Sequence, residues 1–409
     1  MQILKRKLKS AIWRFKNFSY RAFHATIKFT VEVVTERYWL LDYLPTFHKK
    51  RTGVLLIRLD LIGDFVLWLD SAQAYRRLYP NKKITLAVNS TCSDLASSLP
   101  HWDEVISINV HELRTNYLYR AWTLTKLRWS NFAIAIQPTF SREFVGDLFT
   151  RACFAPDRIG YNGDSNNISE HLKTTTDRWY TKLVVTNTNY LMELNINAHF
   201  VRELGCNDFL SSLPVIPHTA TLKSELIFEK PYVVIAPGAS WQPKRWPIQH
   251  FHELICQINQ QFDVQFVLCG GKDDQMLCAG LAQNLNMKNL TNTAGLTTLT
   301  ELVEIIRHAA LVVTNDSSPT HIAAATDTPS VCILGGGHFG RFLPYHIESN
   351  ASSVMPIALT YPMECFGCNW QCRYLGELIT TVPCISDVFV SEALRHSTNL
   401  LTKKIEPTA

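Results

Sequence analysis

A glycine and an aspartate just after the first apolar run are the clearest candidates for acid–base chemistry. Gly63 and Asp64 follow the run Val54–Ile57, and a helical pattern begins at Asp64. Glycine permits close approach of a ligand, and a carboxylate at this place could take a proton from an attacking hydroxyl. Asp64 could equally be a plain helix N-cap, and Asp60 competes with it for the role of base.

The loop after the apolar run Tyr232–Ala236 offers two cations. A Pro-Gly turn leads to Ser240 and then to Lys244 and Arg245. Two cations beside a cleft can neutralise a diphosphate leaving group, which is the task of a divalent metal in metal-dependent transferases. A solvated loop with two surface cations is the competing interpretation.

A polar loop with a histidine follows the apolar run Leu311–Thr314. Asp316, Ser317, Ser318 and His321 stand where a helix is expected to begin. Backbone N–H groups at a helix N-terminus bind phosphate, and hydroxyls add donors. Because Asp316 would repel a phosphate, we expect it beside a sugar hydroxyl or a cation. The alternative is a capping loop with a hydrogen-bonded histidine.

Glycine-rich turns follow two further apolar runs. In Gly335–Gly337 and Gly270–Gly271 the missing side chains could let the backbone approach a ligand, although many such turns bind nothing. The second turn continues into Asp273 and Asp274. An acidic pair there could hold ribose hydroxyls, as an acidic residue does in dinucleotide-binding folds.

Four of the eleven cysteines cluster near the C-terminus, at Cys365, Cys368, Cys372 and Cys384. Their spacing suits a structural zinc site with four thiolate ligands. Free thiols, a disulfide or an iron–sulfur centre are the alternatives, and a stable disulfide is less expected in a cytosolic protein. We expect no metal in the chemistry and no required cofactor.

Each of these loops must be positioned by the elements around it. Continuous apolar runs separated by helical patterns are typical of parallel strands buried on both faces. Two such series predict two Rossmann-like α/β domains, and ligands bind beyond the carboxyl ends of their strands. The candidate residues should therefore meet in a cleft. The predicted strands are 54–57, 84–88, 105–108, 133–136, 232–236, 265–269, 311–314 and 330–334, and the predicted helices include 64–80, 248–260, 274–284 and 299–308.

The domain boundaries follow from the same pattern. We place a first Rossmann-like domain at 51–217, a second at 218–395 and a tail at 396–409. Residues 1–50 mix Lys and Arg with aromatic residues and are predicted to form one or two helices. Such a segment suits a membrane surface, and a helical extension packed on the protein is the alternative.

Composition excludes several classes of protein. Apolar residues make up 46% and charged residues 18% of the chain, which is enough to fill large cores. No apolar stretch reaches the roughly 18 residues of a spanning helix, and no clean signal peptide is recognisable. We therefore expect a cytoplasmic protein, peripheral on the inner membrane. The net charge of +5 is mild and no nucleic-acid-binding module is present, so nucleic acid is not an expected partner.

Taken in order, these blocks resemble glycosyltransferase family 9, the ADP-heptose:lipopolysaccharide heptosyltransferases. The resemblance extends over residues 52–395 and lies in the ordered set of motifs. The matching blocks are Val54–Arg58 with Gly63 and Asp64, Pro237–Ala239 with Lys244–Pro247, Gly295–Leu302, Asn315–His321, and the four clustered cysteines. Ser318 departs from the family pattern, which usually has glycine at this place.

The resemblance implies a GT-B fold and an inverting, metal-independent transfer of a sugar from a nucleotide diphosphate. Asp64 would be the general base, and Lys244 would stabilise the diphosphate. The donor, ADP-heptose or a similar nucleotide sugar, would contact Ser240, Lys244, Asp273, Asp274, Asp316, Ser317, Ser318 and His321. Arg58 and Gly63 would contact the acceptor, a lipopolysaccharide core or related lipid-linked glycan at the inner leaflet.

Two other functions use the same scaffold. A sugar-nucleotide epimerase or hydrolase would turn over the donor without a lipid-linked acceptor. A non-catalytic sugar-nucleotide-binding protein would have lost the carboxylate base. The chain retains Asp64, Lys244, Asp316 and His321, which favours the transferase.

Overall fold

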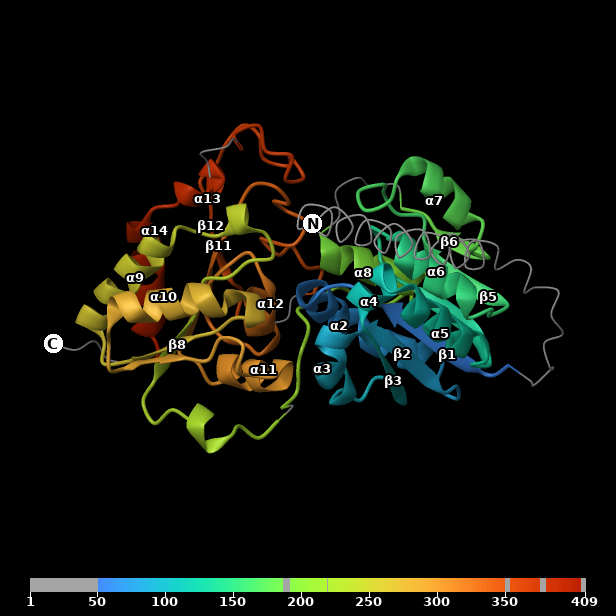
Figure 1. Ribbon diagram of the computed structural model, residues 1–409, viewed down its shortest axis with the longest axis horizontal. Coiled ribbons are helices and arrows are strands. Elements are labelled where there is room, and N and C mark those ends of the chain that lie inside the picture. The colour runs from blue at the N-terminus through green and yellow to red at the C-terminus, as the bar shows by residue number, and fades with distance from the viewer. Residues whose placement is uncertain (1–50, 187–191, 219, 350–353, 376–379, 406–409) are drawn as a thin grey trace, which may run out of the picture.

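The computed structural model describes residues 51–186, 192–218, 220–349, 354–375 and 380–405, which form two α/β domains side by side (Figure 1). Each domain is built on a six-stranded parallel sheet. The prediction of two Rossmann-like domains is confirmed. The predicted membrane-binding helices at residues 1–50 lie outside the described residues.

The N-terminal sheet has the strand order β3-β2-β1-β4-β5-β6. Along β1, Val54 and Leu56 pack on one face of the sheet while Leu55 and Ile57 pack on the other, and all four are buried. Burial on both faces explains why this strand is a continuous apolar run. The strands are β1 Gly53–Arg58, β2 Ile84–Asn89, β3 Glu104–Ile108, β4 Phe132–Gln137, β5 Asp157–Tyr161 and β6 Lys182–Val184.

Helices cover both faces of this sheet. Side chains of α2, α3 and α8 pack on the face of Val54, and side chains of α4, α5 and α6 pack on the face of Leu55. The helices are α2 Ile62–Leu78, α3 Ser93–Ser97, α4 Val110–Thr115, α5 Tyr117–Arg128, α6 Phe144–Ala152, α7 Glu170–Asp177 and α8 Glu193–Glu203.

The C-terminal sheet has the strand order β12-β11-β10-β7-β8-β9. In both sheets the first strand of the domain lies between its second and its fourth strand, which is the Rossmann order. Beside that first strand the strand order reverses direction, and such folds bind ligands at this topological switch point. The strands are β7 Tyr232–Ala236, β8 Gln265–Leu268, β9 Leu290–Asn292, β10 Leu311–Asn315, β11 Ser330–Ile333 and β12 Ile357–Leu359.

The C-terminal helices are also divided between two faces. Side chains of α9, α10, α13 and α14 pack on one face, and those of α11 and α12 pack on the other. The helices are α9 Ile248–Gln261, α10 Gln275–Leu285, α11 Leu299–Arg307, α12 Ser318–Ala325, α13 Pro383–Ser386 and α14 Val390–Leu401. Leu401 is fully buried, so the predicted boundary at residue 395 falls inside α14, which belongs to the C-terminal domain.

The two domains meet where α2 packs against α12 (Figure 1). Trp68 of α2 and Ile322 of α12 belong to the same buried cluster. On α11, the backbone N–H of Thr300 donates to a carboxylate oxygen of Asp94 at 3.2 Å. The predicted boundary at residues 217 and 218 falls between α8 and β7, where the backbone N–H of Ile216 donates to the carbonyl of Ala325 at 2.9 Å.

Candidate active site

A cavity of about 920 Å³ opens between the two domains, at the carboxyl ends of both sheets. Loops after strands of both domains line it, as the sequence predicts. Of the candidate residues, its wall includes Arg58, Gly63, Asp64, Ser240, Lys244, Asp316, Ser317, Ser318 and His321. The structure therefore brings together motifs that lie far apart in the sequence.

Asp64 lies in the first turn of α2 and faces this cavity. Leu61 is the N-cap of that helix, so the alternative of Asp64 as N-cap is wrong. Burial raises the pKa of Asp64 to about 7, helped by the negative charges of Asp60 and Glu193 and opposed by two arginines. A carboxylate that exchanges its proton near neutral pH is suited to general base catalysis.

Asp60 is engaged by the buried Arg58. The Arg58 Nε lies 2.8 Å from Asp60 Oδ2, and only 1% of the arginine side chain is exposed. The same guanidinium donates to the backbone carbonyl of Asp64 at 3.1 Å. Arg58 thus holds both acidic residues in place, and the Asp60 carboxylate is already engaged in an ion pair with it. This favours Asp64 as the carboxylate that meets a substrate.

Gly63 lies against His321 of the other domain. A Cβ added at Gly63 would stand 3.1 Å from the His321 ring carbon Cδ2 and 3.8 Å from the Cα of Ser318. The missing side chain therefore lets the first loop approach the start of α12. The structure gives Gly63 a packing role between domains, in addition to its place in the cavity wall.

His321 is a buried, neutral histidine. Its Nδ1 lies 2.6 Å from the hydroxyl of Tyr345, and burial lowers the pKa of His321 to about 4. At neutral pH the ring therefore has one N–H. If the tyrosine hydroxyl donates to Nδ1, then Nε2 carries the proton and can donate to a ligand oxygen.

Lys244 reaches the cavity from the short helix Gln242–Lys244. Its ammonium lies 4.1 Å from the ring centroid of Trp370, a cation–π contact. Burial lowers the pKa of Lys244, and the carboxylates of Asp316 and Asp64 oppose that shift. Lys244 is thus a partly desolvated cation that faces a carboxylate from each domain.

Trp370 is itself held by contacts that the sequence does not reveal. Its indole N–H donates to Nδ1 of His338 at 3.2 Å, and Nε2 of His338 lies 2.6 Å from the side-chain oxygen of Asn369. Trp370 and Asn369 both have left-handed backbones, with φ of 61° and 49°. Such a conformation is uncommon for tryptophan, so the surrounding contacts must stabilise it.

The N-terminus of α12 faces the cavity next to Lys244. Ser318 is its first residue, and Ser317 is its N-cap. Burial raises the pKa of Asp316, and the Lys244 ammonium opposes that shift. The preceding residue, Asn315, is fully buried; its amide donates to the carbonyl of Pro237 at 2.7 Å. Asn315 thereby ties this loop to the loop that carries Lys244.

Asp273 and Asp274 are not among the residues that line the cavity. They lie on the short helix Lys272–Asp274. Asp274 accepts from Arg245 at 3.3 Å and from the backbone N–H of Gly271 at 3.1 Å. The ion pair directs Arg245 toward Asp274, so Lys244 is the cation of this loop that faces the cavity. Contact of either aspartate with a ribose stays a prediction.

Several cavity residues were missed from the sequence. Arg341 of the C-terminal domain donates to Ser141 at 3.0 Å and lies 3.4 Å from a carboxylate oxygen of Glu193, both in the N-terminal domain. The amide of Asn369 donates to Asn166 at 3.2 Å across the same gap. Single polar residues on separate elements give no pattern in sequence, and only the tertiary fold brings them together.

The turn Gly335–Gly337 makes room for aromatic rings. A Cβ at Gly336 would meet the ring of Phe366 at 2.2 Å, and one at Gly337 would meet Trp370 at 2.4 Å. The expectation that these glycines admit a ligand to the backbone is therefore wrong. They admit the cysteine-bearing segment, which places Trp370 beside Lys244.

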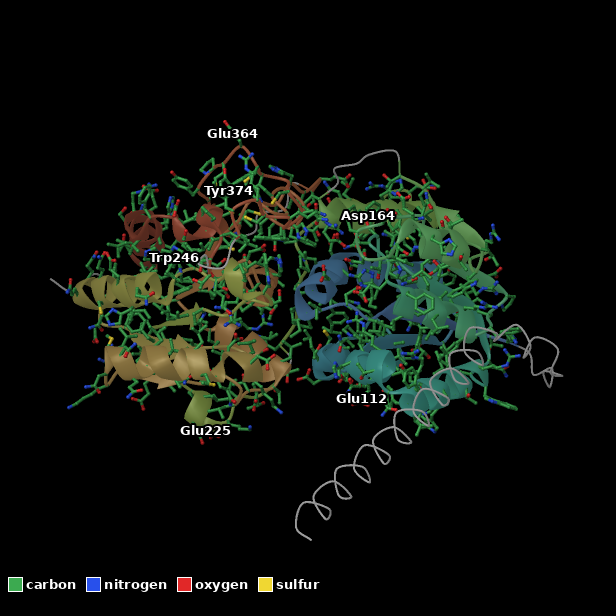
Figure 2. The ribbon with its side chains drawn as sticks, turned by 45° about the horizontal axis from the view of Figure 1, so that its top comes forward. Glu112, Asp164, Glu225, Trp246, Glu364 and Tyr374 are labelled. Carbon is green, nitrogen blue, oxygen red and sulfur yellow. The ribbon has the colours of Figure 1, made fainter. Side chains whose placement is uncertain are left out.

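The four clustered cysteines line one small cavity, together with Trp370 and Tyr374. Figure 2 shows sulfur atoms gathered near the labelled Tyr374, at the top of the C-terminal domain. Cys384 is buried, and its sulfur accepts from the backbone N–H of Gly336 at 3.4 Å. Among the described residues, no group of three His, Cys, Asp or Glu side chains has a geometry that could hold a metal ion.

Comparison with known proteins decides the family. The sequence profile of glycosyltransferase family 9 (heptosyltransferase) matches residues 126–364, more than half of the chain. The chain belongs to glycosyltransferase family 9. A lipopolysaccharide heptosyltransferase 2 of Salmonella typhimurium is 26% identical in an alignment of 320 positions that covers 69% of this chain and 82% of that relative.

Solved structures of this family share the fold. The structure of Escherichia coli ADP-heptose lipopolysaccharide heptosyltransferase II superposes with a TM-score of 0.63 at 21% identity, covering 86% of this chain and 99% of that one. An iron-containing dodecameric glycosyltransferase of enterotoxigenic E. coli gives a TM-score of 0.52 at 16% identity, covering 88% and 79%. The GT-B arrangement predicted from the sequence is confirmed.

The family 9 assignment makes the protein a glycosyltransferase and disfavours the epimerase or hydrolase alternative. In the part of the chain that the structure describes, no helix has both the length and the apolar character of a membrane span.

Proposed function

We propose that this enzyme transfers heptose from ADP-heptose to a lipopolysaccharide core or related lipid-linked glycan, with inversion at the sugar carbon. The names of the relatives support this donor and this acceptor. The observation that carries the mechanism is the pairing of Asp64 and Lys244 across one cavity. A carboxylate with a pKa near 7 faces a buried cation from the opposite domain.

The first step assigned to this chain is proton removal. The ionised Asp64 carboxylate accepts the proton of an acceptor hydroxyl as that oxygen attacks the anomeric carbon. The new bond joins the acceptor oxygen to the sugar, and the bond from the sugar to the diphosphate breaks. Arg58 holds the loop in place by its bonds to Asp60 and to the Asp64 backbone. We propose that Arg58 and Gly63 lie on the acceptor side of the cavity, whose wall includes both.

The second step is stabilisation of the leaving diphosphate. Lys244, the hydroxyls of Ser240, Ser317 and Ser318, and the N-terminus of α12 supply positive charge and hydrogen-bond donors. The neutral His321 adds an N–H donor. These groups can neutralise the leaving charge by themselves, so we propose that transfer needs no divalent cation. We propose that Asp316 accepts from a sugar hydroxyl, because its carboxylate would repel phosphate.

The four cysteines are proposed to hold a structural metal ion, zinc or iron. The ligand type suits such an ion, and Cys365, Cys368, Cys372 and Cys384 line the same small cavity. Among the described residues no three of them stand in a metal-binding geometry, so the thiols must move closer together when the ion binds. A solved neighbour is itself described as iron-containing. A metal there would fasten the segment that carries Trp370 and would stay outside the chemistry. Elemental analysis of purified protein should find about one zinc or iron per chain, lost in Cys368→Ser; metal-free native protein would contradict the site.

Donor turnover tests the proposed function. Release of nucleoside diphosphate is measured from ADP-heptose and from UDP-, GDP- and dTDP-sugars, with and without a lipid-linked glycan extract, in the presence of EDTA. We expect release that requires ADP-heptose and the extract and survives EDTA. Turnover without extract would instead indicate a hydrolase or epimerase, and tight donor binding without turnover would indicate a binding protein.

The location of such an acceptor leads to a proposal on localisation. A lipid-linked core is made at the inner leaflet, so we propose that the enzyme works on the cytoplasmic side as a peripheral protein. Fractionation of cells should find it with the inner membrane at low salt, and partly released at high salt because surface electrostatics are screened. Recovery entirely in the soluble fraction at low salt would contradict this localisation.

A further inference from the structure

Helix α5, Tyr117–Arg128, has apolar side chains on two opposite faces. Leu124 and Leu127 pack inward with α4 and α6 in the core of the N-terminal domain. Leu118 and Trp122 point outward, and Trp129 follows at the end of the helix. A surface helix normally has one apolar face and one polar face, so the outward face calls for an explanation.

The outward face carries three exposed apolar side chains in a stripe, with Lys126 between the two tryptophans. Leu118 is 72% exposed, Trp122 is 61% exposed and Trp129 is 74% exposed. Their spacing of four and seven residues places them on the same side of a helix. Single exposed apolar residues are ordinary on protein surfaces. Two tryptophans and a leucine on the same side of a helix form an apolar surface, and a binding partner that covers it removes this surface from water.

A cation lies within this stripe. The ammonium of Lys126 lies 5.2 Å from the ring centroid of Trp122. The guanidinium of Arg120 lies on the other side of the helix, where it donates to the backbone carbonyl of Leu113 at 2.8 Å. Aromatic rings with adjacent Lys and Arg suit the boundary between lipid head groups and acyl chains, where rings insert and cations meet anionic phosphates. Helix α5 itself contains no Asp or Glu.

The position of α5 links this stripe to the cavity. Helix α4 packs against α5 (Figure 1), and Val110, His111 and Arg114 of α4 line the cavity wall. A surface that docks on α5 would therefore lie beside the N-terminal rim of the cavity. An acceptor anchored in that surface could reach Asp64 without leaving it.

We propose that the outward face of α5, made by Leu118, Trp122, Lys126 and Trp129, docks the enzyme on the anionic phospholipid surface of the membrane that carries its acceptor. The proposal deepens the proposed function and rests on its lipid-linked acceptor. It assigns membrane contact to residues inside the folded N-terminal domain, separate from residues 1–50. Lys126, on a helix without Asp or Glu, favours an anionic bilayer over a second copy of the chain as the occupant.

Vesicle binding of the full-length protein tests the docking face. Wild-type protein is floated with phosphatidylcholine vesicles that contain or lack phosphatidylglycerol. We expect binding to the anionic vesicles, and roughly tenfold weaker binding for the double variant Trp122→Ala, Trp129→Ala, because two interfacial rings are lost. Lys126→Glu should reduce binding to anionic vesicles only.

Phe389→Ala is the matched control, because Phe389 is an aromatic residue 63% exposed on the C-terminal domain. It should bind vesicles as wild type does. Brominated lipid should quench tryptophan fluorescence in the wild type and much less in the double variant. Unchanged binding and quenching in the double variant would overturn the proposal, as would a dimeric wild type that becomes monomeric in the variant without a change in vesicle binding.

A soluble acceptor separates this test from the proposed function. The double variant should keep wild-type transfer to a deacylated, water-soluble core and lose most transfer to the same core embedded in vesicles. Equal loss on both acceptors would mean that α5 serves the fold or the cavity, and would overturn docking. A wild type that binds anionic vesicles through α5 and transfers to neither acceptor would refute the proposed function alone.

Discussion

The two domains have the same strand order, but the edges that they contribute to the cleft differ in their charged groups. On the N-terminal edge, Asp60 and Glu193 lie near Asp64 and are opposed by Arg58, and by Arg341, which reaches across from the C-terminal domain. On the C-terminal edge, the Lys244 ammonium lies over the ring of Trp370, and His321 is neutral. Rossmann topology thus fixes where a site lies and leaves its electrostatics to the loops.

The difference has a chemical consequence. Crowded like charges raise the pKa of a carboxylate toward the pH at which a base works best. The partly buried Lys244 ammonium, over the ring of Trp370, is poorly hydrated, so it interacts strongly with negative charge that develops nearby. One edge is therefore suited to moving a proton, and the other to receiving an anion.

The largest effect should come from removing the base. Asp64→Asn keeps the shape of the side chain and cannot accept the proton, so we expect kcat to fall by about 10³-fold or more with little change in donor binding. Steady-state kinetics and donor titration measure the two quantities. Asp60→Asn is the matched control, because Asp60 is held by Arg58; a greater loss in Asp60→Asn would exchange the roles of the two residues.

Stability checks that Asp64→Asn is folded. Burial raises the pKa of Asp64 from 3.8 to about 7 in the folded state, so the wild type loses stability as pH rises through that interval. The amide carries no charge to bury. At pH 8 the variant should therefore melt at the same temperature as the wild type or higher, and a clear drop in melting temperature would point to a structural role.

Removal of the facing cation should have the next largest effect. Lys244→Ala should lower kcat/KM by roughly 10²-fold, because the leaving diphosphate loses its nearest charge. Arg245→Ala should cost far less in rate, since Arg245 is bonded to Asp274 away from the cavity. Equal losses in the two variants would show that both cations stabilise the donor, and would contradict the assignment of Lys244 as the cation of this loop that faces the cavity.

The pH–rate profile tests whether Asp64 is the base and which charges raise its pKa. If Asp64 is the base, as proposed, it must be ionised to act, and kcat/KM should fall about tenfold per unit as pH drops below about 7 and should level off above that value. Glu193→Gln removes one of the negative charges that raise this pKa, so the midpoint should move to lower pH. A midpoint that stays in place in Glu193→Gln would contradict the proposed origin of the shift.

The smallest effect concerns the ring beneath Lys244. Trp370→Leu removes the cation–π contact at 4.1 Å and should raise the donor KM by about three- to tenfold, with a smaller change in kcat. Trp370→Phe keeps a ring and should recover part of the loss. A fall in kcat without any change in KM would assign Trp370 to the reaction step instead of to donor binding.

Much of the fold could be predicted from the sequence, because buried parallel strands are continuous apolar runs. Val54–Ile57 and Leu311–Val313 show this pattern, and each is a central strand. The edge strands β9 and β12 have only three residues each, which is too short to give a pattern. They form because a neighbouring strand offers its hydrogen-bonding groups.

The site could be predicted only where its residues follow those strands. Asp64, Lys244 and His321 were found because each comes soon after the end of an apolar run. Trp370 was not, since it lies in an irregular segment and reaches Lys244 through the space that Gly337 leaves. Glu193 lies on a helix of the N-terminal domain, and its effect on Asp64 arises from tertiary packing alone.

Gly63 and His321 meet at the interface between the two domains, so a side chain added at position 63 would change how the domains pack. A methyl group there would meet the histidine ring at 3.1 Å, at the point where α2 and α12 hold the domains together. In a mutational scan, Gly63 should thus tolerate substitution poorly for a mechanical reason. Gly63→Ala should limit how closely the two domains approach each other when the donor binds. Small-angle scattering of the donor-bound enzyme would measure this change in the distance between the domains.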